Sequence, residues 1–184
     1  MIYDPSQVYR PEADTCLLLE AALAEVKPGD RVLEVGTGSG LIACEIAKIV
    51  PVVATDINPH AAVSARNCGV EVIRTDLFAG ICGMFDVILF NPPYLPTLPE
   101  EKIDDWLEYA LDGGESGRVV IERFAAEVNR ILSPCGRILL LVSSLTDPDE
   151  VRDFFSQQGF SSAIAVREIV EDEELIVLRI IRAR

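Results

Sequence analysis

Four consecutive residues combine a side-chain amide, two rigid residues and an aromatic ring: Asn91, Pro92, Pro93 and Tyr94. They follow residues 85–90, where five of the six side chains are apolar, a pattern typical of a strand buried on both faces. Proline lacks an N–H and fixes φ, so this strand must end near Asn91. Loops that leave the carboxyl ends of strands bind ligands in open α/β sheets. The sequence therefore predicts a ligand-binding loop at residues 91–94.

A glycine-rich turn lies upstream, between a short strand predicted at residues 31–35 and a helix predicted at residues 41–49. Its glycines are Gly36, Gly38 and Gly40. Glycines at such a turn let a ligand approach the backbone and the N-terminus of the following helix. We therefore predict that a ligand binds against this turn. The alternative is a tight turn from strand to helix that binds no ligand and uses the same glycines.

Carboxylates select between possible ligands. Asp56 follows a predicted strand at residues 52–55 and can accept hydrogen bonds from ribose hydroxyls, and Asp76 follows the next strand and suits an amino group such as that of adenine. The turn lacks the G-x-x-G half of the dinucleotide fingerprint. Glu34, two residues before Gly36, would repel a pyrophosphate but suits the ammonium and sulfonium of S-adenosylmethionine. The pattern favours S-adenosylmethionine over a dinucleotide.

The remaining elements follow from periodicity and from proline and glycine positions. Helices are expected at residues 14–26, 58–68, 119–132 and 148–157, and strands at 70–75, 137–143, 163–169 and 175–181. The last two strands are joined by the acidic run 171–174, which is too short for a crossover helix and implies an antiparallel hairpin. We predict an α/β fold with a doubly wound, mainly parallel sheet of seven strands and one antiparallel strand.

Length and composition indicate one soluble domain over residues 1–184, with residues 1–30 as a helical lead-in. Residues 95–117 are acidic and rich in proline and glycine, so we expect a lid or a wall on the substrate side. No apolar run is long enough to span a membrane and no leader is visible, which favours the cytoplasm.

The formal net charge of −14 opposes binding to nucleic acid. The five cysteines are scattered without a C-x-x-C pair, and we expect reduced thiols in the core. With His60 as the single histidine, no metal site is expected, and His60 is assigned to the first turn of a helix.

Several of these motifs together resemble class I methyltransferases, and specifically the HemK family, which methylates glutamine in class I release factors. The resemblance rests on residues 32–40, Asp56, the pair Asp76 and Leu77, and residues 91–94. Residues 9–15 and 113–118 are similar to the short archaeal and eukaryotic branch, so the likeness covers nearly the whole chain. It implies a Rossmann-like fold, S-adenosylmethionine as cofactor with S-adenosylhomocysteine as product, and a release factor as protein substrate.

The resemblance also implies roles for single residues. The catalytic set is Asn91, Pro92, Pro93 and Tyr94, with Asn91 touching both substrates. The cofactor set is Thr15, Glu34, Gly36, Gly38, Gly40, Asp56, Ile57, Asp76, Leu77 and Asn91. Thr15 could instead be only a helix-start residue, and Tyr94 could serve only in loop packing.

The loop at residues 91–94 has groups that could hold an amide nitrogen as the methyl acceptor. If the Asn91 side-chain oxygen and the Pro92 carbonyl each accept one N–H, the amide nitrogen is held toward the methyl group. Tyr94 offers a flat face for a planar amide or a base. An adenine amino group in DNA or RNA has the same geometry and is the alternative substrate. A second alternative is a scaffold that binds S-adenosylmethionine without turnover.

One edge of the sheet is a candidate interaction surface. The strand at residues 70–75 is expected at the border, where Val70, Val72 and Ile73 would provide a template for an added strand. Relatives in the short branch use a small zinc-binding activator protein, which the resemblance implies at this edge. Covering of the edge by loops of this chain is the alternative.

Overall fold

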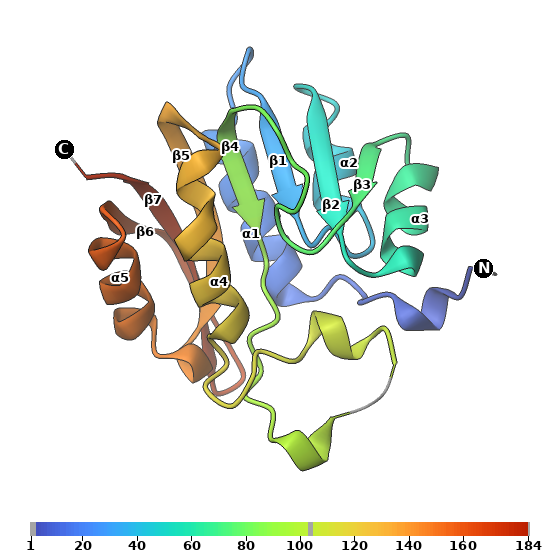
Figure 1. Ribbon diagram of the computed structural model, residues 1–184, viewed down its shortest axis with the longest axis vertical. Helices are drawn as coiled ribbons and strands as arrows, with labels where there is room; N and C mark the ends of the chain where they lie inside the picture. The colour runs from blue at the N-terminus through green and yellow to red at the C-terminus, as the bar shows by residue number, and fades with distance from the viewer. Residues whose placement is uncertain (1–2, 103–104, 184) are drawn as a thin grey trace.

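The computed structural model describes residues 3–102 and 105–183, so residues 103 and 104 of the predicted loop 95–117, and the ends of the predicted domain, lie outside the described residues. A seven-stranded sheet with the order β3-β2-β1-β4-β5-β7-β6 runs through the molecule (Figure 1). The strands are β1 (Val32–Val35), β2 (Val52–Asp56), β3 (Glu71–Arg74), β4 (Phe85–Phe90), β5 (Leu132–Ser143), β6 (Phe160–Val170) and β7 (Glu173–Arg182).

Strand direction matches the predicted fold class. The neighbours from β3 to β5 all pair in parallel, whereas β7 pairs antiparallel with both β5 and β6. A two-residue turn, Glu171 and Asp172, joins β6 to β7. The doubly wound sheet with one antiparallel strand in a C-terminal hairpin is therefore confirmed.

Helices cover both faces of the sheet (Figure 1). They are α1 (Ala13–Glu25), α2 (Leu41–Ile46), α3 (Pro59–Asn67), α4 (Val119–Glu127) and α5 (Pro148–Gln157), with short 3-10 turns at Pro5–Gln7, Pro99–Glu101, Glu108–Ala110, Val128–Arg130 and Ser144–Thr146. Apolar side chains of α4 and α5 join one core cluster, and those of α1, α2 and α3 join the other. Among the described residues, no helix has the length and apolar character needed to cross a membrane.

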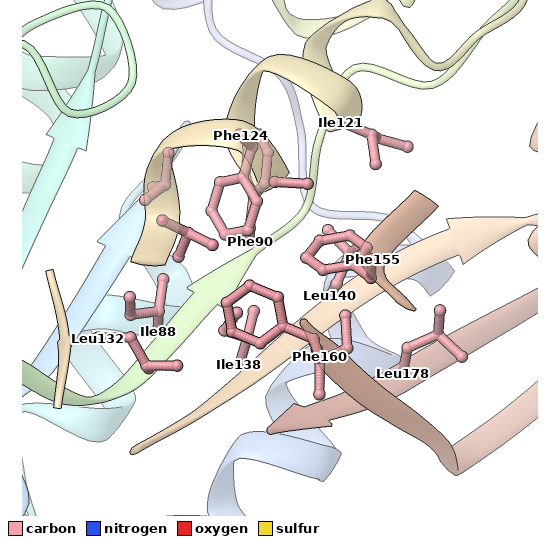
Figure 2. Packing of buried hydrophobic residues seen from close by; sticks show 14 of the residues in the cluster. Ile88, Phe90, Ile121, Phe124, Leu132, Ile138, Leu140, Phe155, Phe160 and Leu178 are labelled. Carbon is pink, nitrogen blue, oxygen red and sulfur yellow. The ribbon is translucent and has the colours of Figure 1, made fainter. Parts of the chain in front are cut away.

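The central strand β4 contributes to both clusters, because successive side chains of a strand point to opposite faces. Ile88 and Phe90 lie in the cluster under α4 and α5, whereas Val87 and Leu89 lie in the other. Figure 2 shows Phe90 beside Phe124 of α4, and their ring centroids are 4.7 Å apart. This packing fixes the end of β4, and with it the start of the loop at Asn91.

Two boundaries differ from the sequence prediction by five residues each, more than any other boundary of a helix or strand. The helix predicted at residues 119–132 ends at Glu127, and β5 begins at Leu132 rather than at Arg137. Leu132 pairs with Phe85 and Arg137 with Val87, so the residues between them, including Pro134, form an irregular bulge. Pro134 lies in the gap that the sequence prediction left between the helix and the strand. A bulge tolerates this proline, because the missing N–H interrupts no ladder there.

The expectation of core thiols is wrong. Cys16, Cys68, Cys82 and Cys135 are exposed and Cys44 is partly exposed, all five as free thiols. Cys16 and Cys44 are in helices, Cys68 and Cys82 are in connections, and Cys135 is in the irregular start of β5. The core is filled mainly by valine, leucine, isoleucine and phenylalanine. His60 is in the first turn of α3, as predicted.

Candidate active site

A cavity of about 670 Å³ lies at the carboxyl ends of the central strands. The chain after β4 runs past these ends, and the N-terminal segment approaches them from the other side (Figure 1). The lining residues come from the turn after β1, the ends of β2 and β3, the loop after β4, the first fifteen residues and the loop before α4. The cavity thus gathers the motifs that stand out in the sequence.

The glycine turn forms one wall of the cavity. Gly36 and Gly38 line it and have φ angles of +65° and +54°, a region that other residues rarely adopt. A Cβ built on Gly38 would have no atom within 4 Å, so open space lies beside this backbone. A ligand can therefore approach the turn closely.

Gly40 has a different environment from that expected of a cofactor contact. It is not among the residues that line the cavity. A Cβ on Gly40 would lie 2.6 Å from Cα of Ala65 in α3. Gly40 lets the start of α2 pack against α3, which is a structural role.

Glu34 is buried at the floor of the turn, with 3% of its surface exposed. Its Oε2 atom accepts hydrogen bonds from the Thr37 hydroxyl over 2.5 Å and from the Ala43 backbone N–H over 3.1 Å. Burial raises the pKa of Glu34 to about 8, more than these hydrogen bonds lower it. Near neutral pH this carboxyl holds a proton that a neighbouring cation would displace.

Asp56 is the last residue of β2, and its carboxylate holds the glycine turn and the start of α3 in place. Its Oδ2 accepts the Gly38 N–H over 2.8 Å, and its Oδ1 accepts the Asn58 N–H over 2.8 Å. Burial raises the pKa of Asp56. Each carboxylate oxygen retains a lone pair, so Asp56 can still accept bonds from a ligand in the cavity, which it lines beside Ile57.

Asp76 and Leu77 line the same end of the cavity. Arg123 of α4 donates to Asp76 Oδ2 over 2.7 Å, and both side chains are about half exposed. Leu77 has a φ of +45°, an uncommon backbone conformation for a leucine. Arg123 also lines the cavity and was not predicted, because it lies in the chain 47 residues from its partner.

Asn91 lines the cavity at the end of β4, between the first turn of α1 and the glycine turn, and its carbonyl oxygen would lie 3.8 Å from a Cβ built on Gly36. Its Nδ2 atom donates to Asp14 Oδ2 over 3.1 Å. Tyr9 donates to the same oxygen over 3.1 Å. The Asn91 Oδ1 atom is buried and has no hydrogen-bond partner among the described residues. A buried acceptor without a partner is costly, and a donor on a ligand would satisfy it.

The other predicted residues of this end also line the cavity: Thr15, Pro92, Pro93 and Tyr94. Thr15 donates both its N–H and its hydroxyl to Asp14 Oδ1. Tyr94 is partly buried, which raises its pKa and keeps the phenol neutral. Asp14, Tyr9 and Glu173 were not predicted as site residues, although Tyr9 and Asp14 lie inside the motif at residues 9–15.

The loop before α4 closes one side. Leu107, Tyr109 and Leu111 line the cavity. Asn58 donates to the carbonyl of Gln7 over 2.7 Å and to that of Trp106 over 3.3 Å, so it ties this loop to the N-terminal segment. Among residues 3–102 and 105–183, no group of three or more histidine, cysteine or acidic side chains is placed to hold a metal ion.

Comparisons with known proteins agree with this geometry. The family described as "Methyltransferase small domain" matches residues 10–103. A protein named as an N5-glutamine methyltransferase in Methanocaldococcus jannaschii is 43% identical over 94% of this chain and 90% of its own length. The human methyltransferase HEMK2 is 35% identical over 95% of this chain and 89% of its own length. The chain belongs to the HemK family of methyltransferases.

A solved structure extends the likeness of this HemK-family chain to three dimensions. It is similar to a chain in the E. cuniculi Mtq2–Trm112 complex, with a TM-score of 0.81 and 31% identity over 96% of this chain and 99% of that one. That complex is described as responsible for methylation of the eRF1 translation termination factor. The resemblance to the HemK family and to class I methyltransferases is confirmed.

Proposed function

We propose that this enzyme transfers a methyl group from S-adenosylmethionine to the side-chain amide nitrogen of the glutamine in the Gly-Gly-Gln motif of a class I release factor. The observation that carries the proposal is the buried Asn91 Oδ1 atom, which lacks a partner among the described residues. Asn91 lines the cavity beside the glycine turn, because Gly36 and Asn91 follow paired residues of β1 and β4. The named activities of the relatives from Methanocaldococcus jannaschii and E. cuniculi support the same substrate.

The donor set of the cavity fits S-adenosylmethionine. Open space beside Gly38 leaves room for the methionine part, and buried Glu34 suits its ammonium group. Asp56 would accept hydrogen bonds from the ribose, and Asp76, beside Leu77, would accept one from the adenine amino group. When bound, the cofactor supplies a methyl group on a sulfonium and leaves as S-adenosylhomocysteine.

An amide nitrogen is a poor nucleophile, because its lone pair is delocalised into the carbonyl. Residues of this chain can compensate for this by orienting the nitrogen. Asn91 Oδ1 and the Pro92 carbonyl would each accept one N–H and so fix the direction of the nitrogen. As positive charge develops on nitrogen, both acceptors bind it more strongly, which stabilises the transition state. The two prolines hold the loop rigid, and Tyr94 packs against the amide plane.

The charge of the acceptor end argues against the alternative of an adenine in DNA or RNA. Glu12, Asp14 and Glu173 all line the cavity, and the net charge of the chain is −14. Phosphates next to the acceptor would be repelled by these carboxylates. A protein substrate has no such penalty.

The test is methyl transfer from labelled S-adenosylmethionine to a purified class I release factor, followed by mass spectrometry of the labelled peptide. We expect the label on the Gly-Gly-Gln glutamine, and none on a release factor in which that glutamine is alanine. Label that persists on the alanine variant would contradict the proposal. Asn91→Ala should lose turnover while retaining cofactor binding, whereas a non-catalytic scaffold would keep its biological role in this variant.

We also propose that a small zinc-binding activator of the Trm112 type adds to the free edge of β3. The edge position of β3 and its exposed Ile73 support this site, as does the partner in the related complex. Co-expression should improve yield or activity, and Ile73→Lys should weaken co-purification without changing cofactor affinity. Equal yield and activity with and without the activator would count against it. Because the proposed substrate is a translation factor, we also propose that the enzyme acts in the cytoplasm.

A further inference from the structure

We infer that Asp14 is a positioning residue that sets the polarity of Asn91 and thereby makes the acceptor end selective for an N–H donor. This inference rests on the proposed function. Asp14 is 3% exposed and lies 77 residues before Asn91, in the first turn of α1.

Hydrogen bonds hold each oxygen of Asp14 in a defined role. Oδ1 accepts the backbone N–H of Thr15 over 2.5 Å and its hydroxyl over 3.1 Å. Oδ2 accepts hydrogen bonds from the Tyr9 hydroxyl and from the Asn91 Nδ2 atom, each over 3.1 Å. A carboxylate can only accept, so the neighbouring atom of Asn91 must be its NH₂ group.

These hydrogen bonds decide which atom of the Asn91 amide faces the cavity. A side-chain amide has a donor and an acceptor on opposite sides, and Asp14 takes the donor. The acceptor Oδ1 is therefore the atom left for a substrate. A glutamine amide offers an N–H to this oxygen, whereas the carboxylate of a glutamate would be repelled by it. Without Asp14 the amide could rotate and present its NH₂ group, which would repel the N–H of the substrate.

Asp14→Asn is the decisive variant. The Thr15 N–H keeps the oxygen of the new amide on its own side, so the new NH₂ group faces Asn91 and favours the inverted orientation of Asn91. We expect kcat for the release factor to fall by about 100-fold, the typical cost of one lost hydrogen bond to the transition state. Affinity for S-adenosylhomocysteine should change by less than about threefold, because the new amide oxygen keeps both bonds from Thr15 and the other cofactor residues are unchanged. Asp149→Asn, at an exposed position of α5, is the matched control and should keep full activity.

Two double variants separate positioning from a merely structural role. In an Asn91→Ala background, Asp14→Asn should cause almost no further loss, because its target is gone. The exchange Asp14→Asn with Asn91→Asp rebuilds the pair in reverse, with the new amide donating and the new carboxylate accepting. We expect this exchange to recover about tenfold over Asn91→Asp alone, equal to ~1.4 kcal/mol of coupling.

The outcomes are distinct. Full kcat in Asp14→Asn, or additive losses in the Asn91→Ala background, would overturn the inference. If Asp14→Asn fails to fold, the exchange decides: recovered turnover supports the inference and no recovery overturns it. Absence of methylation by the unaltered enzyme would instead refute the proposed function.

Discussion

The carboxyl group of Glu34 accepts a hydrogen bond from the hydroxyl of Thr37 over 2.5 Å, and the Glu34 side chain is almost fully buried at the edge of the cavity. Burial raises the pKa of this group to about 8, from an ordinary value of 4.5. Between these two pH values the folded protein keeps a proton that the unfolded chain releases. The contribution of Glu34 to the free energy of unfolding should therefore fall as pH rises from about 4.5 to 8.

Glu34→Gln should remove this dependence, because an amide is neutral at every pH. We expect the variant to be more stable than the parent above pH 8, in the absence of cofactor, and to lose the advantage as pH falls toward 4.5. Urea unfolding at half-unit pH steps checks the prediction. Two curves that stay parallel over the whole range would show that Glu34 is already ionised in the folded protein.

Cofactor binding should depend on pH through the same group. The ammonium of S-adenosylmethionine favours the ionised form of Glu34, so binding below pH 8 releases a proton and affinity weakens as pH falls. Calorimetry in buffers of different ionisation enthalpy measures this proton directly. Glu34→Gln should release none, and proton release unchanged in that variant would assign it to another group.

Gly40→Ala should destabilise the fold by much more than Gly69→Ala. The two glycines have nearly the same φ, +89° and +85°, so the backbone strain of an alanine is matched. Only at Gly40 does the new Cβ meet a neighbour, 2.6 Å from Cα of Ala65. We expect an extra loss of about 1–3 kcal/mol from this overlap, measured by chemical denaturation. Equal losses would mean that α2 and α3 can separate without cost.

Arg137→Met should also be strongly destabilising. The Arg137 guanidinium is nearly buried and pairs with Glu25 at 3.0 Å and with Asp30 at 2.7 Å. Its removal leaves two carboxylates without their buried partner, a loss of about 3 kcal/mol. Arg152→Met breaks an exposed pair with Asp149 and should cost less than about 1 kcal/mol. Similar stability for both variants would contradict this interpretation of the buried cluster.

Local patterns predicted which residues come together at the ends of β1, β2 and β3. The glycines at 36 and 38, and the acids at 34, 56 and 76, all line one cavity, because each lies within three residues of the carboxyl end of a parallel strand. The position of Asn91 followed from the buried strand before it and the prolines after it. These features depend on neighbours in sequence, which a single chain reveals.

Contacts between distant segments were harder to predict. Asp14 reaches Asn91 across 77 residues and Arg123 reaches Asp76 across 47. No local periodicity encodes either contact, although the motif at residues 9–15 marked the first segment as special. The start of β5 was missed for the same reason, because only the pairing of Leu132 with Phe85 shows that the residues around Pro134 form a bulge within this strand. Gly40 matched a binding pattern, yet its reason lies in Ala65 of another helix.

The position of β7 in the sheet determines when the sheet can be completed during synthesis of the chain. β7 is the last strand of the sheet in chain order but lies between β5 and β6. Until residues 173–182 have been synthesised, β5 has an unpaired edge and β6 has no strand to join. That edge includes Leu139 and Leu141, so the incomplete chain offers an apolar strand to other nascent chains. An enzyme proposed to act on translation termination therefore acquires its own complete sheet only after its last strand has been translated.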